Sequence, residues 1–304
     1  MIVHLNGELV PRAEARLDPF DRGFLFADGV YEGLRADGGR VIAAGYHADR
    51  LAAGLRECGI SGFDAGELEP MTEGLLRANG LSEAFVYWQV TRGAPAAGRP
   101  VRARLAEADQ RPTVFGYAEE VEPVSSWSEP RAVEVATVRD DRWTRGHIKS
   151  VSLLPGVLAA IEAGRRGAED AVFVRGRRVA EAVASNVFLV RGGEIATPSL
   201  ESASILAGVT RRLIIEELPG VAERAVWAEE LASAEEVVLA GTRSMVSWVR
   251  RVDGRLMGEG PGEGARAMLE ALVRAVASGR GSDRGSGVRW RPLDEGADAA
   301  GGGA

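Results

Sequence analysis

The run Arg145-Gly-His-Ile-Lys-Ser-Val-Ser-Leu-Leu-Pro-Gly-Val-Leu-Ala159 contains the residue that says most about the fold. Lys149 stands in this run, in a chain that uses arginine almost everywhere it needs a cation. An arginine side chain stays protonated in proteins, whereas a lysine can become a neutral amine and form a Schiff base with an aldehyde. A lysine retained here therefore indicates chemistry that arginine cannot perform.

Composition limits the class of protein. A chain of 304 residues is long enough for two domains with a substantial core. The formal net charge of −7 gives a nucleic-acid partner no electrostatic basis. Cys58 stands alone, so no internal disulfide is expected, which fits a reducing cytoplasm. Without a long apolar run or a signal-type start, we expect a soluble, cytoplasmic protein that does not bind membranes.

Turn and periodicity signals predict the local elements. An Asn6-Gly7 turn between apolar runs predicts a hairpin over residues 2–10. Apolar spacing predicts a helix over 47–57 that Gly59 ends. We also expect a strand over 40–44, after a glycine turn, and a helix over 205–217.

Composition also predicts the domain organisation. Residues 118–130, rich in proline and serine, are typical of a linker between domains. We expect a small N-terminal α/β domain over 1–117 and a larger C-terminal, cofactor-binding domain over 131–277. The glycine-rich tail, 278–304, is expected to be disordered. Interspersed strands and helices predict a mixed α/β (α+β) fold.

Several motifs follow one another in a characteristic order around Lys149. They are Asp21-Arg-Gly-Phe-Leu-Phe-Ala-Asp-Gly-Val-Tyr-Glu32, Tyr46-His-Ala-Asp-Arg-Leu51, Glu181 with Ser185-Asn186, and Gly208-Val-Thr210. Together with Lys149 they resemble the class IV (fold-type IV) pyridoxal-phosphate-dependent aminotransferases, with D-amino acid aminotransferases the nearest match. The resemblance covers nearly the whole chain, from about Asn6 to about Ala277.

The resemblance implies a cofactor, a reaction and an assembly. It implies pyridoxal 5'-phosphate held in a cleft between two domains, and a homodimer in which loops of one subunit complete the other's site. It implies transfer of an amino group from a D-amino acid, such as D-alanine or D-glutamate, to a 2-keto acid. The loop over 93–104 is our candidate for the segment that reaches the second subunit, and no metal is expected.

Two residues are expected to act on the reacting end of the cofactor. The resemblance makes Lys149 the Schiff-base lysine, which as a free amine also moves the substrate proton. It makes Glu181 the partner of the pyridine nitrogen, where an ionised acid keeps that nitrogen protonated. Glu181 lies in the apolar run Ala180-Glu-Ala-Val-Ala184, and a buried charge there needs a partner. The family's usual glycine after this glutamate is Ala182 here.

The cofactor phosphate is expected at a helix start. By the resemblance, Val209 and Thr210 supply backbone N–H groups and a hydroxyl there. Arg50 is expected to add a cation that can bind the phosphate with two hydrogen bonds. Thr242 is expected to add another hydroxyl, and Leu206 to pack under the ring.

The expected substrate contacts depart from the family pattern. Tyr31 and Glu32 match residues that face the substrate, but strand alternation sends only one of two neighbours to a given face. The usual Arg-x-His pair that binds the substrate carboxylate is missing, because Ala97 and Arg99 occupy those positions. Arg99 and Arg243 are the substrate-binding candidates, with Arg35 a weaker one.

Other functions stay open at this stage. Aminodeoxychorismate lyases, branched-chain L-amino acid aminotransferases and (R)-amine transaminases belong to related groups with the same cofactor. A binding protein that keeps the fold without catalysis is a further alternative. The presence of Lys149, Glu181 and Arg50 argues against it.

Overall fold

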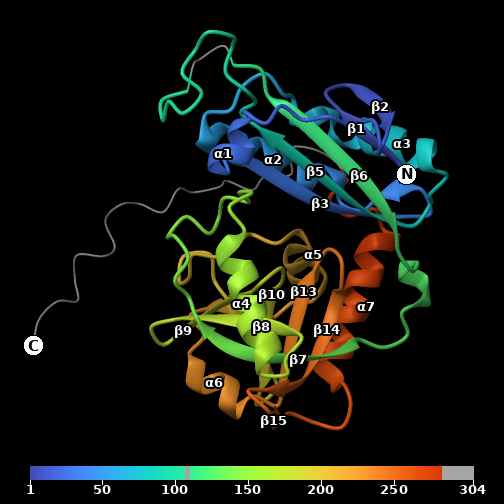
Figure 1. Cartoon of the computed structure of the whole chain (residues 1–304). Helices are drawn as coiled ribbons and strands as arrows, with labels where there is room; N and C mark the ends of the chain where they lie inside the picture. Colours follow the sequence, from blue (N-terminus) through green and yellow to red (C-terminus); the bar gives the residue numbers. More distant parts are fainter. Residues whose placement is uncertain (107–109, 283–304) are drawn as a thin grey trace, which may run out of the picture.

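The chain forms two halves, each built around its own β-sheet. A computed structural model describes residues 1–106 and 110–282. The N-terminal half contains a six-stranded sheet in the order β2-β1-β6-β5-β3-β4, and the C-terminal half a nine-stranded sheet. In Figure 1 the N-terminal half lies above the C-terminal half, and α7 lies beside the lower sheet. This is the mixed α/β fold that the sequence predicts.

The elements of the N-terminal half form an antiparallel sheet and two long helices that pack on it. They are β1 (Ile2–Leu5), β2 (Glu8–Pro11), α1 (Arg22–Phe26), β3 (Gly29–Asp37), β4 (Arg40–Val41), α2 (Ala44–Cys58), α3 (Leu68–Asn79), β5 (Ala84–Thr91) and β6 (Thr113–Glu120), with a 3-10 turn at Ala65–Glu67.

The C-terminal half follows a short 3-10 turn at Val124–Ser126. Its elements are β7 (Arg131–Arg139), α4 (Leu154–Arg165), β8 (Asp170–Arg175), β9 (Arg178–Ala182), β10 (Asn186–Arg191), β11 (Glu194–Pro198), α5 (Val209–Glu217), β12 (Ala222–Arg224), α6 (Ala228–Ser233), β13 (Glu236–Gly241), β14 (Met245–Val252), β15 (Arg255–Leu256) and α7 (Glu263–Ala277). Strands β14, β7 and β8 run parallel at the centre of the sheet.

Local sequence signals account for several element boundaries. The predicted hairpin is confirmed, because Asn6 and Gly7 both adopt positive φ between β1 and β2. Helix α2 ends where Gly59 takes the left-handed conformation that glycine adopts without steric cost. Helices α5 and α7 bury their apolar sides against β10, β13 and β14, which fixes the C-terminal core.

Two local predictions are wrong. The strand predicted over 40–44 stops at Val41, because Ala43 turns into the left-handed region and α2 begins at Ala44. The helix predicted over 205–217 begins only at Val209, after Gly208 in an extended conformation. Leu206 therefore lies in an irregular segment whose backbone N–H is available to a side chain.

Arg35 holds the two halves together. This β3 side chain is buried, and its guanidinium donates to the carbonyl of Arg243, between β13 and β14, at 2.9 Å. It also donates to the carbonyl of Glu122, in the segment that joins the sheets, and lies over the Trp127 ring. Charge-assisted hydrogen bonds of this kind fix the position of one sheet against the other.

No helix among residues 1–106 and 110–282 is long and apolar enough to span a membrane. Of the tail predicted from Ser278, residues 283–304 lie outside the described part of the chain.

Candidate active site

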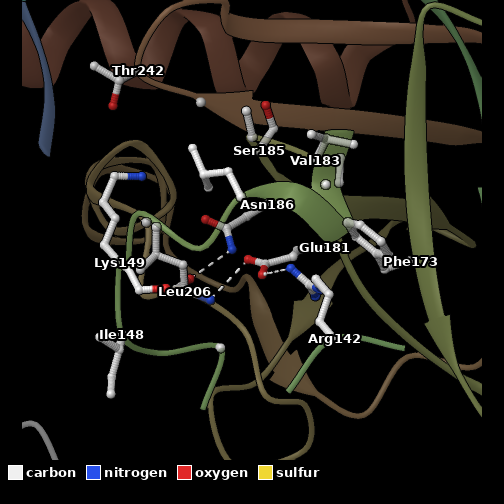
Figure 2. A pocket seen from close by; sticks show the side chains of 18 of the residues that line it. Arg142, Ile148, Lys149, Phe173, Glu181, Val183, Ser185, Asn186, Leu206 and Thr242 are labelled. Carbon is white, nitrogen blue, oxygen red and sulfur yellow. Dashed lines mark hydrogen bonds and ion pairs between the residues drawn. The ribbon is translucent and has the colours of Figure 1, made fainter. Parts of the chain in front are cut away.

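One cavity opens where the two halves meet, and the motifs around Lys149 converge on it. Strand β3 and helix α2 contribute Tyr31 and Arg50. The C-terminal half contributes the remaining walls, which are Arg142–Trp143, Gly146, Ile148–Ser150, Ser152–Leu153, Pro155–Gly156, Phe173, Glu181–Asn186, Leu206, Gly208–Thr210 and Ala240–Thr242. Figure 2 shows part of this lining at close range, with Lys149, Glu181 and Arg142 among the labelled side chains.

Lys149 is positioned by a short segment that pairs with β3. The amide of Tyr31 donates to the Lys149 carbonyl at 2.9 Å, and the amide of Val151 donates to the Gly29 carbonyl at 3.1 Å. Upstream, a side chain at Gly146 would collide with the backbone of Ser204, so glycine is required there. The lysine, the only one in the sequence, projects into the cavity with Nζ 4.2 Å from the centre of the Tyr31 ring.

Glu181 lies at the end of β9 and is held on both carboxylate oxygens. Arg142 Nη1 donates to Oε1 at 2.7 Å, and the backbone N–H of Leu206 donates to Oε2 at 2.9 Å (Figure 2). Burial raises the pKa of Glu181, while Arg142, the Leu206 N–H and Lys149 lower it; burial outweighs them, so the pKa stays above its usual value.

The opposite end of the cavity is built to bind an anion. Helix α5 begins here, so its first N–H groups have no partner within the helix. A Cβ at Gly208 would lie 1.9 Å from Asn186 Oδ1, so a larger residue there would displace the Asn186 amide, whose Nδ2 donates to the Leu206 carbonyl at 2.9 Å. The Thr210 and Thr242 side chains line the same end. These donors fit a phosphate group.

Arg50 reaches the cavity from the N-terminal half and is oriented by Glu32. Its Nε donates to Glu32 Oε1 at 2.8 Å and its Nη2 to Oε2 at 2.7 Å, while Nη1 donates to the Ala207 carbonyl at 3.0 Å. His47 Nδ1 lies 2.8 Å from Glu32 Oε2. Burial alone would raise the pKa of Glu32, but Arg50 and His47 outweigh it and lower that pKa to about 2. Alternation along β3 sends Tyr31 to the cavity and Glu32 to Arg50.

The arginines expected to bind the substrate carboxylate do not line this cavity. Arg243 donates to Glu119 at 2.9 Å and lies over the Phe85 ring. Arg99 lies in an exposed turn of the 93–104 loop, and Arg35 holds the backbone of the two halves. Among the described residues, the arginines that line the cavity are Arg50 and Arg142, and each is paired with a glutamate.

Arg142 is a site residue that the sequence analysis missed. It lies seven positions before Lys149, and its guanidinium lies 4.0 Å from the centre of the Phe173 ring. In an arginine-rich chain, no local signal distinguishes it from a solvated side chain. The spacing Arg-x6-Lys becomes informative only when Glu181 is known to need a buried cation.

The sequence and the fold of this chain are both similar to those of known aminotransferases. Residues 29–252 match the amino-transferase class IV family. The chain is 31% identical over 283 residues to a D-alanine aminotransferase of Staphylococcus haemolyticus, covering 91% of this chain and 98% of that protein. A Thermoproteus uzoniensis branched-chain aminotransferase, solved with norvaline, superposes with a TM-score of 0.78 at 26% identity, covering 93% and 96% of the two chains. A hypothetical aminotransferase from Mycobacterium tuberculosis in a PLP-bound form gives a TM-score of 0.78 at 21% identity, covering 92% and 100%.

The pairing of Glu32 with Arg50 predicts a pH-dependent loss of stability. Glu32 has a folded pKa of about 2 against an ordinary value of 4.5, so its stabilising effect is complete above about pH 4.5 and is lost as the pH falls toward 2. We expect Glu32→Gln to lower the free energy of unfolding by roughly 3 kcal/mol at neutral pH, because Arg50 then lacks its buried counter-ion. Urea unfolding between pH 7 and 3 measures this difference. The free energies of unfolding of Glu32→Gln and the parent protein should approach one another as the pH falls.

The exposed Glu73, paired with Arg77 on the surface of α3, supplies the matched control. Glu73→Gln is expected to have the same free energy of unfolding as the parent protein at every pH. A Glu32→Gln gap that is constant or widens toward pH 3 would contradict the ion-pair account.

Proposed function

The chain belongs to the class IV aminotransferases, and from that premise we propose that it uses pyridoxal 5'-phosphate to move an amino group from a D-amino acid to a 2-keto acid. The observation that carries this proposal is the cavity itself, where a lysine, a buried glutamate and a helix start meet. The 31% identity to a D-alanine aminotransferase over nearly the whole chain supports the D-amino acid class.

Lys149 is the residue that would bind the cofactor covalently and move the substrate proton. Its amine projects into the cavity between Tyr31 and the Glu181 end. As the chain's single lysine, it is the only side chain that can form a Schiff base with the cofactor aldehyde. Released as a free amine, it would take the proton from the substrate Cα and deliver it to the cofactor carbon that carries the aldehyde, C4′.

The two ends of the cavity would orient the cofactor. The N–H groups at the start of α5, the Thr210 and Thr242 hydroxyls and Arg50 would hold the phosphate. Glu181 would hold a proton at the ring nitrogen. When bound, the cofactor supplies the electron sink that stabilises negative charge on the substrate Cα. Leu206 lines the wall between the two ends, where it would pack against the ring.

The substrate carboxylate needs a cation from outside this cavity wall. Both arginines of the wall are already paired with buried glutamates, and a carboxylate entering a desolvated pocket requires its own partner. We assign this role to the 93–104 loop of a second copy, with Arg99 the candidate residue. Tyr31 faces the cavity beside Lys149 and would contact the substrate.

A branched-chain amino acid aminotransferase is the second candidate. Apolar side chains form the wall between Phe173 and the start of α4, including Leu153, Val183 and Ala184. Such a wall would accept the aliphatic side chain of a substrate. The fold of this protein also resembles that of a branched-chain aminotransferase.

Single half-reactions decide between these substrates. We expect D-alanine to remove the visible absorbance of the bound cofactor at least about 10-fold faster than L-leucine does. A site that orients the Cα–H bond of a D-amino acid misplaces the Cα–H bond of an L-amino acid. Stopped-flow absorbance without a keto acid measures each donor separately, and Lys149→Ala is the inactive control. Faster conversion by L-leucine than by any D-amino acid would overturn the proposal in favour of the second candidate.

The exposed surface of α4 supports a homodimer. This helix presents Leu154, Val157, Leu158 and Ile161 to solvent, with 66% of Leu154 and 57% of Leu158 exposed. A soluble monomer rarely exposes so many aliphatic side chains on one helix. Because Pro155 and Gly156 at the start of α4 also line the cavity, a second copy seated on α4 would lie beside the cavity mouth. We propose that this face is the dimer interface.

Leu158→Glu tests the interface. A charge at the centre of a buried apolar contact loses its hydration, so we expect the dissociation constant of the dimer to rise by about 100-fold or more. Analytical ultracentrifugation over a concentration series measures the change. Leu9→Glu, on β2, is the matched control because that leucine is also exposed but belongs to the sheet of the N-terminal half. Equal dimerisation of both variants would contradict the assignment.

A further inference from the structure

A group of paired charges, formed by Asp140, Arg142 and Arg175, lies behind Glu181. The Asp140 side chain, which follows β7, is fully buried. It accepts from Arg142 Nε at 2.9 Å through Oδ1 and from Arg142 Nη2 at 3.2 Å through Oδ2. Arg142 thus bridges two carboxylates, with Asp140 on one side and Glu181 on the other, 2.7 Å from Nη1.

Arg175 closes the cluster on its outer side. Its Nη2 lies 3.0 Å from Asp140 Oδ2, and it also donates to the carbonyl of Arg142 at 3.1 Å. One third of the Arg175 side chain is exposed, so water screens its charge more than that of Arg142. Burial alone would raise the pKa of Asp140, but the two arginines outweigh it and lower that pKa, so Asp140 is ionised.

The charge balance of this cluster explains why Asp140 is needed. Glu181 and Arg142 cancel one another, so as a pair they offer no net negative charge to a protonated ring nitrogen. Asp140 restores one negative charge to the buried group of three. Buried charges interact through a low effective dielectric constant, so this charge is felt at Glu181 even though Asp140 lies behind Arg142.

We propose that Asp140 is a positioning residue for the aminotransferase reaction, acting through Arg142 so that Glu181 keeps a proton on the pyridine nitrogen of the cofactor. Asp140 holds Arg142 in line with Glu181 and offsets the positive charge that Arg142 brings. Arg175, on the solvent side of Asp140, partly neutralises the negative charge of Asp140. The inference rests on the role proposed above for Glu181.

The protonation state of the ring nitrogen tests this directly. The holoenzyme is prepared with cofactor labelled with 15N in the ring, and the 15N chemical shift at neutral pH reports the proton. We expect the protonated shift in the parent protein, and a move toward the unprotonated shift in Asp140→Asn. The same variant should raise the dissociation constant of the cofactor about tenfold. Asp140→Glu, which restores the charge, should recover the protonated shift.

Neighbouring residues supply matched controls. Asp141 pairs with Arg139 on the surface, so Asp141→Asn should leave the shift and the cofactor affinity unchanged. Arg175→Gln should act opposite to Asp140→Asn, keeping the nitrogen protonated to a higher pH, because it removes a positive charge beside Asp140. Arg177, two positions on and paired with Glu229 at the surface, should have no effect when changed to Gln.

The outcomes separate this proposal from the assignment of Glu181. A 15N shift that moves in Glu181→Gln but not in Asp140→Asn would overturn the role of Asp140 and leave Glu181 in place. A shift that moves in neither variant would overturn both. A lower melting temperature of Asp140→Asn with an unchanged shift would show a purely structural residue. A ring nitrogen that loses its proton at a lower pH in Arg175→Gln than in the parent protein would also contradict the proposal.

Discussion

Neutralising buried charge is the constraint on which this structure depends. The junction of the two sheets buries Glu32, Arg50 and Glu181 and leaves Arg142 only partly exposed, and an unpaired ion there would cost several kcal/mol. Each is therefore paired across elements: Arg50 of α2 with Glu32 of β3, and Arg142, which follows β7, with Glu181 of β9. These pairs fix the cavity walls. The lysine amine, the start of α5 and the two paired arginines all line this cavity.

The sequence predicts the parts of the site whose chemistry is local. Lys149, the run around Glu181 and Gly208-Val-Thr210 each have neighbours along the chain that favour one role, and the structure brings all three to one cavity. The hairpin at Asn6-Gly7 and the end of α2 at Gly59 follow from backbone preferences in the same way. Arginine pairing cannot be predicted like this, because the partner is chosen by tertiary structure. Arg243 meets Glu119 from a distant strand, and Arg142 meets Asp140 and Glu181.

The same charge pairing bears on specificity. Since the arginines that line the cavity are each paired with a glutamate, we infer that recognition of the substrate carboxylate falls to another surface, supplied by a second copy seated on the exposed aliphatic face of α4. In this proposed dimer, assembly and substrate binding would be linked, because one subunit would supply the cofactor site and its partner would complete the substrate site. Such a division would let the loop over 93–104 depart from the family pattern while the cofactor site keeps it.

The most direct test of the account is reductive trapping of the cofactor. Borohydride converts a Schiff base into a stable secondary amine, and this chain offers a single lysine to form one. We expect one phosphopyridoxyl group per chain after reduction, found by peptide mass spectrometry on Lys149 and absent from Lys149→Arg. A reduced holoenzyme that carries no such group, or carries it only on the N-terminal amine, would contradict the central claim that Lys149 holds the cofactor.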